Sequence, residues 1–148
     1  MENYQLIQQD LQIISPGNIP AITPFFGPSS DLVEQTKSLF KQIRRVKSNG
    51  KRTELLTLIF YLGEILENKA SNKLERSSCQ KVLTGYYNRV AIRTYYLFEF
   101  LGVEQIARTQ YTSLATISRL SKPHYRELVQ ESITIAGARF EEEEVVIM

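Results

Sequence analysis

The chain has 148 residues, 43% of them hydrophobic and 23% charged, with a formal net charge of +2 at pH 7. This length and composition fit one globular domain with a real core, whereas so small a charge argues for nucleic-acid binding only if the basic residues cluster. The chain shows no signal-peptide pattern and no apolar run long enough to span a bilayer, so we expect a cytoplasmic protein with no membrane partner.

Residues 1–30 differ in composition from the rest of the chain. Four of the five prolines recur there at every fourth residue, at positions 16, 20, 24 and 28, and proline disfavours helix at and before its own position. We therefore predict an extended N-terminal arm, in which the apolar residues from Tyr4 to Ile14 fit a short helix or a strand. The arm is too apolar for a solvated linker, and we expect it to pack on its own domain or on a second subunit. Its candidate partner-binding residues are Ile19, Ile22, Phe25 and Phe26.

Asp31 followed by Glu34 predicts the start of a helix, which the apolar period of 3.6 residues continues to Val46 and Asn49-Gly50 ends. The opposite face and the following turn are basic: Lys37, Lys41, Arg44, Arg45, Lys47, Lys51 and Arg52. This pattern fits a phosphate-contacting surface or a solvated helix face. Lys41, Arg44 and Arg45 are our nucleic-acid-binding candidates here.

The next predicted helix, from a Thr53 cap to about Asn68, is apolar on nearly all sides and should be central or lie in a subunit interface. We expect Gly63 to permit the close approach of another helix. A helix from Lys73 follows, and residues 86–101 form a helix rich in aromatic side chains, which Gly102 ends.

One face of the helix over residues 86–101 alternates arginine with aromatic residues: Tyr86, Arg89, Arg93, Tyr96 and Phe100. Such a stripe can hold phosphates and stack on bases, and it can equally form a protein interface. Arg89 and Arg93 are therefore nucleic-acid-binding candidates, and Tyr86 and Tyr96 are partner-binding candidates.

Residues 103–120, VEQIARTQYTSLATISRL, predict two short helices around the turn Gln110-Tyr111-Thr112. We expect Ser113 to cap a second helix that begins at Leu114. The residues expected to be buried are Ile106, Ala107, Ile117 and Leu120. The segment resembles the helix-turn-helix of lac-repressor-like bacterial regulators at Ile106, Ala107, Ser113, Thr116, Ile117, Ser118 and Arg119. Tyr111 stands where that family usually has glycine, and a left-handed backbone there would carry a steric cost.

The resemblance implies a DNA-binding regulatory protein in which residues 114–120 enter the major groove as the recognition helix. Its base-facing residues would be Ser113, Ala115, Thr116, Ser118 and Arg119, and its backbone contacts would be Lys122, Arg126 and Arg108. A homodimer is expected, because such motifs usually bind DNA as dimers. The alternatives are a purely structural helical hairpin, a homo-oligomeric helical adaptor or assembly factor, and a protein that binds RNA or single strands.

Ser121-Lys122-Pro123 predicts the start of a last helix, which we expect to end at Gly137, although Ile133-Thr134-Ile135 also fits a strand. The run Glu141–Glu144 then predicts a solvated acidic tail. No residues form a catalytic pattern: His124 has no paired nucleophile, and the glycines form no phosphate loop. The single Cys79 excludes an internal disulfide bond and a thiol-based zinc site.

Taken together, the sequence predicts an all-α protein with a single domain of about five to six helices. Residues 1–30 form the extended arm, 31–138 the helical domain with its helix-turn-helix-like segment at 103–120, and 139–148 the acidic tail. We expect no enzyme activity, no cofactor, no metal and no small-molecule substrate.

Overall fold

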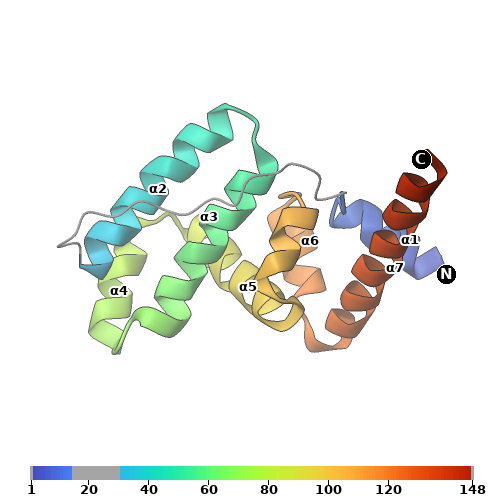
Figure 1. Cartoon of the computed structure of the whole chain (residues 1–148). Coiled ribbons are helices and arrows are strands. Elements are labelled where there is room, and N and C mark those ends of the chain that lie inside the picture. Colours follow the sequence, from blue (N-terminus) through green and yellow to red (C-terminus); the bar gives the residue numbers. More distant parts are fainter. Residues whose placement is uncertain (1, 15–30, 148) are drawn as a thin grey trace.

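The computed structural model describes residues 2–14 and 31–147, and at residues 2, 3, 5 and 137–147 it describes the backbone alone. The described residues form seven α-helices, a π-helical turn and a 3-10 helix, and contain no strand (Figure 1). The elements in chain order are α1 (Glu2–Asp10), α2 (Leu32–Ser48), α3 (Arg52–Glu64), η1 (Ile65–Lys69), α4 (Lys73–Val82), α5 (Gly85–Leu101), η2 (Val103–Arg108), α6 (Leu114–Leu120) and α7 (Pro123–Ile147). The all-α prediction is confirmed. Six of these α-helices follow residue 31, and α1 adds a seventh.

Helix α2 begins and ends as its sequence predicts. The Asp31 carboxylate accepts a hydrogen bond of 2.8 Å from the Glu34 backbone N–H and so caps the first turn. After α2, the chain turns toward α3 at Gly50, which has a φ of +71°, a conformation that glycine adopts without steric cost. The buried face of α2 carries Thr36, Leu39, Phe40, Ile43 and Val46.

Helix α3 is central and packs against both α2 and α5 (Figure 1). Its closest approach to α5 is at Gly63, where an added Cβ would lie 2.2 Å from the Ala91 carbonyl oxygen. The expected role of Gly63 is therefore confirmed. Thr53 is not the cap of this helix, because α3 begins at Arg52 and the Thr53 hydroxyl donates instead to the Thr109 carbonyl oxygen at 3.1 Å.

The core lies on both sides of the α3–α5 pair. On one side these two helices pack with α2 and α4 around residues such as Leu39, Leu58 and Cys79. On the other side they pack with α1, η2, α6 and α7 around Phe60, Phe98 and related residues. One pair of helices therefore holds the two ends of the molecule together.

Of the two alternatives for the first part of the arm, the structure has the helix: residues 2–10 form α1, which packs on α7 (Figure 1). Ile7 is 3% exposed and Leu11 is 0% exposed, and the Gln8 side-chain amide donates to the Ser132 carbonyl oxygen at 3.0 Å. The spacing of Ile7 and Leu11 suits one face of a helix once a partner surface is present. The candidate residues Ile19, Ile22, Phe25 and Phe26 lie outside the described residues.

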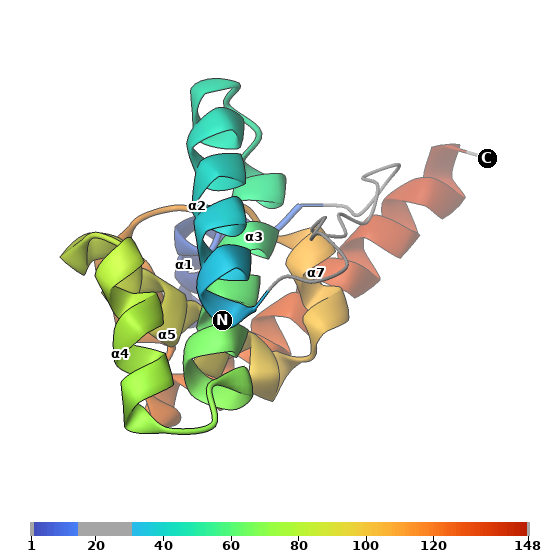
Figure 2. The same ribbon diagram turned by 90° about the vertical axis from the view of Figure 1, so that its left-hand side faces the viewer.

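Helix α7 continues through Gly137 to Ile147 and projects from the other helices (Figure 2). The expected helix end at Gly137 and the strand alternative at Ile133-Thr134-Ile135 are therefore wrong, and the backbone of residues 139–147, predicted as an acidic tail, is helical. Alanine, arginine and glutamate are good helix formers, and this run of residues after Gly137 outweighs the cost of a single glycine.

Candidate functional site

The segment over residues 103–120 forms two short helices joined by a turn, as predicted, and α5 packs against both. The first is the 3-10 helix η2 rather than an α-helix, and the second is α6. The backbone N–H of Thr116 donates to the Ser113 hydroxyl at 3.1 Å, which confirms Ser113 as the cap. Ile106, Ile117 and Leu120 are buried as expected, whereas Ala107 is half-buried.

The turn does not need the left-handed residue that the resemblance implied. Gln12 is the one non-glycine residue with a positive φ in the described part of the chain, so Tyr111 carries no such strain. The residues at the two ends of the turn, Thr109 and Ser113, are extended. The turn is fastened to the start of α3, because Thr53 bonds to Thr109 and the Tyr111 N–H donates to the Arg52 carbonyl oxygen at 3.3 Å.

The candidate base-facing residues of α6 differ in exposure. Ser113 and Ala115 are exposed, whereas Thr116, Ser118 and Arg119 are half-buried. The Ser113 hydroxyl donates to the Thr116 hydroxyl at 3.0 Å, so these two side chains also hold one another. The outer face of α6 is thus small and polar near its start and becomes partly covered toward its end.

Arg119 is engaged within the protein. Its guanidinium forms an ion pair with the carboxylate of Asp10 at the end of α1, and it also lies 5.6 Å from the centre of the Tyr125 ring. Sequence reasoning missed Asp10, because no local pattern links residues that lie 109 positions apart. The end of α1 therefore reaches α6 at Arg119, and a ligand of this guanidinium would have to displace Asp10.

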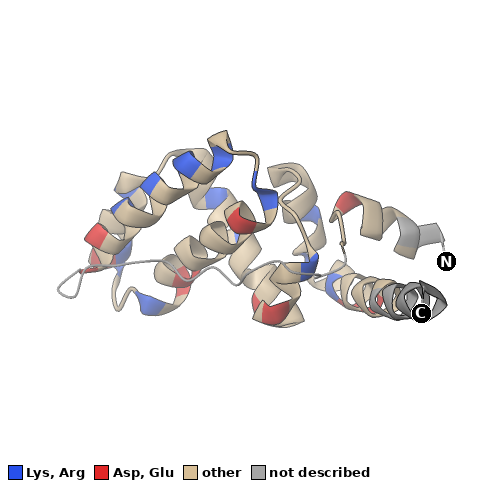
Figure 3. Ribbon diagram, turned by 45° about the horizontal axis from the view of Figure 1, so that its top comes forward, with Lys and Arg blue, Asp and Glu red and all other residues tan. Residues whose placement is uncertain are grey.

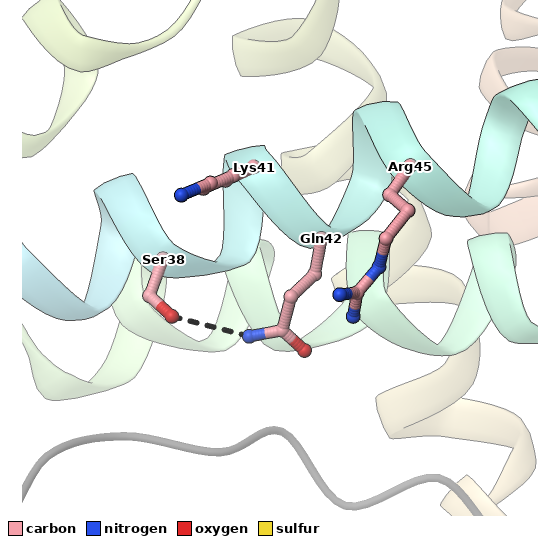
Figure 4. Close-up of a pocket in the computed structure, with 4 residues that line it drawn as sticks. All are labelled: Ser38, Lys41, Gln42 and Arg45. Atoms are coloured by element: carbon pink, nitrogen blue, oxygen red, sulfur yellow. Dashed lines mark hydrogen bonds between the residues drawn. The ribbon is translucent and has the colours of Figure 1, made fainter.

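The basic candidates on α2 are exposed: Lys41, Arg44 and Arg45. The Arg44 guanidinium lies 4.3 Å from the centre of the Phe40 ring. Lys41 and Arg45 line a cavity of about 340 Å³ on this face, together with Ser38 and Gln42, whose side chains share a hydrogen bond of 3.2 Å (Figure 4). Basic residues follow α2 and continue into the turn before α3 (Figure 3).

A second cavity, of about 280 Å³, lies where that turn meets the loop before α6. Its basic residues are Lys47 in the last turn of α2, Lys51 in the connection and Arg52 at the start of α3, and the loop contributes Tyr111 and Thr112. The basic turn and the helix-turn-helix-like segment are separate in the sequence, and the fold brings them to one place.

The predicted stripe on α5 faces solvent. Its members Tyr86, Arg89, Arg93, Tyr96 and Phe100 are all exposed. The Tyr96 hydroxyl donates to the Glu67 carboxylate at 2.5 Å, and this hydrogen bond raises the pKa of Tyr96 above its ordinary value of 10.0. Arg89 and Arg93 form no ion pair with a described residue and remain available to a ligand.

The remaining backbone-contact candidates are dispersed around α6 and α7. Lys122 is exposed and Arg108 is half-buried. Arg126 has a structural role, because its Nε donates to the Ser121 carbonyl oxygen at 2.8 Å and its guanidinium lies 5.9 Å from the centre of the Phe100 ring. Within the described part of the chain these three residues share no cavity or contact that would make them one site, whereas the end of α2 and the turn after it lie beside the loop before α6.

Among the side chains that the structure describes, no cluster could hold a metal ion, and no helix within residues 2–14 and 31–147 is long and apolar enough to cross a membrane. His124 is exposed and lies against the Tyr125 ring, and Cys79 is buried. Comparisons with protein-family models, with curated proteins and with solved structures find no match to this chain.

Proposed function

We propose that this protein binds duplex DNA as a small regulatory protein, with α6 as the helix that enters the major groove. The main support is the attachment of the loop before α6 to the start of α3, through the bonds from Thr53 to Thr109 and from Tyr111 to Arg52. This attachment holds the loop before α6 beside the basic turn after α2, and we infer that the base-contacting groups of α6 and the phosphate-contacting groups of the turn reach the same duplex.

The two parts of this surface have different roles in the proposal. Ser113 and Thr116 offer hydroxyl groups and Ala115 a methyl group, which suit base edges and the thymine methyl. Lys41, Arg45 and their neighbours on α2 supply positive charge to the DNA backbone, a contact that fixes position without reading sequence. At seven residues, α6 spans about two turns and reads only a few base pairs.

The role of Arg119 in DNA binding is the part of the proposal that is tested most directly, because its ion pair with Asp10 can be removed from either side. The Asp10 carboxylate neutralises the guanidinium and would repel DNA, so DNA and Asp10 compete for Arg119. Loss of Arg119 should relax sequence preference, whereas loss of the Asp10 charge should tighten binding.

The experiment is fluorescence anisotropy of the full chain with a panel of duplex sequences across a salt series. We expect affinity to fall steeply with salt. Arg119→Ala should cost about 1–3 kcal/mol on the preferred sequence, and Lys41→Ala should weaken all sequences evenly and lower the salt slope by about 1. Lys73→Gln, an exposed lysine at the start of α4, is the charge-matched control.

Asp10→Asn and Arg119→Ala break the same ion pair, but only Arg119→Ala removes the guanidinium. Comparing the two variants therefore separates a direct contact of Arg119 with DNA from the structural effect of losing the ion pair. If Arg119→Ala and Asp10→Asn weaken binding equally, Arg119 acts only by holding α1. If the unaltered protein does not bind any duplex at low salt, the proposal is wrong.

A second function, as a helical adaptor or homo-oligomer, has support from α5. Tyr96 is 37% exposed and Phe100 is 42% exposed on the same face as Arg89 and Arg93, a composition that suits a protein interface. A concentration-dependent sedimentation coefficient without DNA affinity would favour this function. Preference for single-stranded RNA or DNA in the anisotropy titration would instead assign the stripe to base stacking.

A further inference from the structure

The cavity between the α2–α3 turn and the loop before α6 is positively charged. Lys47 is exposed and forms no ion pair with any residue that the structure describes. Lys51 lies 3.9 Å from Glu54, and its side chain is 59% exposed, so that pair neutralises it weakly. Arg52 donates to the Gln12 side-chain oxygen at 3.4 Å, which is a neutral acceptor. Three cations therefore face one carboxylate.

The start of α3 adds backbone N–H groups near the same cavity, because Arg52, the first residue of that helix, is part of the cavity lining. Lys51 occupies the N-cap position of α3, but its side chain forms no hydrogen bond with the first backbone N–H groups of the helix. The first N–H groups of α3 consequently keep their partial positive charge.

The geometry of the turn leaves room for a ligand. Gly50 adopts a φ of +71°, and beyond its chain neighbours no heavy atom of the described residues lies within 4 Å of the place where a Cβ would stand. The volume of about 280 Å³ is just below that of ordinary ligand sites, which begin at about 300 Å³. Such a space suits a compact anion with part of an attached group rather than a large apolar molecule.

We propose that this cavity binds a phosphate group, held by Lys47, Lys51 and Arg52 through charge-assisted hydrogen bonds. The proposal deepens the proposed function and rests on it, since a backbone phosphate of duplex DNA bound here would fix the register of α6. The same chemistry would accept a free phosphate monoester, and the experiment distinguishes these two sources.

The test uses the ¹⁵N-labelled full chain, titrated with adenosine monophosphate and with inorganic phosphate, and anisotropy of the same protein with duplex DNA. Bound phosphate should shift the amide resonances of Gly50, Tyr111 and Thr112.

Arg52→Gln and Lys47→Gln should each weaken duplex binding by about tenfold or more at low salt and lower the salt slope by about 1. Lys73→Gln is the control for the loss of one charge, at the opposite end of α3 (Figure 1). Thermal unfolding of each variant confirms that it is folded.

Each outcome decides between the two proposals. Loss of duplex binding in both cavity variants but not in Lys73→Gln supports a backbone phosphate. Duplex binding that is unchanged in the cavity variants overturns the phosphate site and leaves DNA binding intact. Binding of adenosine monophosphate at Gly50 and Tyr111 without any duplex binding supports the site with a free ester and overturns the proposed function. Binding of neither overturns both.

Discussion

Thr94 shows how a single buried hydroxyl departs from the usual pattern of a helical threonine. Thr36 and Thr57 donate to the carbonyl oxygens of the residues four positions earlier, at 2.7 and 3.0 Å. Thr94 is 0% exposed on α5, and its hydroxyl has no partner among the described residues. An unmade hydrogen bond of a buried group carries a desolvation cost of about 1–3 kcal/mol.

Thr94→Val should therefore raise the free energy of unfolding by about 1 kcal/mol, because it removes the unbonded hydroxyl and keeps the shape of the side chain. Thr36→Val is the matched control and should lower stability by about 1 kcal/mol, since its hydroxyl is bonded to the Leu32 carbonyl oxygen. Urea unfolding of both variants measures the difference. A loss of stability in Thr94→Val would show that its hydroxyl is satisfied in solution.

At the scale of elements, the packing of α3 on α5 depends on the absence of a side chain at Gly63. An added Cβ would lie 2.2 Å from the Ala91 carbonyl oxygen and 2.6 Å from the Tyr95 Cβ. Both contacts involve groups held by the helix backbone, so the two helices would have to separate. The helix pair that carries both halves of the core thus tolerates no larger residue at its crossing.

Gly63→Ala should lower the free energy of unfolding by about 1–3 kcal/mol, as overpacked cores do. Helix propensity alone predicts the opposite sign, a gain of about 1 kcal/mol, so the sign of the change is decisive. Gly85→Ala is the control at the start of α5, where the nearest atom is the flexible end of Arg89 at 3.3 Å. Its stability should be unchanged or higher by chemical denaturation.

At the scale of the whole molecule, the two ends of the described chain pack together as α1 and α7. The Tyr4 hydroxyl donates to Glu131, which raises the pKa of Tyr4, and Gln8 bonds to the Ser132 carbonyl oxygen. Ile7 and Leu11 complete the core around Phe98 and Val129. The first part of the arm therefore packs on its own domain, since α1 contributes to that core.

Leu11→Ala should destabilise the protein by about 2–5 kcal/mol, because Leu11 is 0% exposed in the core. Leu6→Ala, within α1 and 56% exposed, should change stability by less than about 0.5 kcal/mol. Thermal unfolding should remain a single transition in both variants. Equal effects of the two substitutions would mean that α1 does not pack on α7 in solution.

The local features of this protein follow from the sequence alone. The caps at Asp31 and Ser113 and the helix end at Gly102 depend on groups within about four residues of one another. The 3.6-residue period likewise places the buried face of α2 and the exposed stripe of α5. These interactions are short in sequence, so a pattern in the chain is enough to predict them.

Only the tertiary structure decided where those elements meet. Asp10 pairs with Arg119, and nothing in the sequence near Asp10 indicates this ion pair. Tyr111 lines a cavity with Lys51 and Arg52, and nothing in the sequence near Tyr111 indicates this arrangement. The apolar spacing of α1 fits a helix or a strand until α7 supplies the surface that selects the helix. The candidate basic residues were therefore predictable from the sequence, whereas the site that they form depends on contacts between distant segments, whose energies no local pattern records.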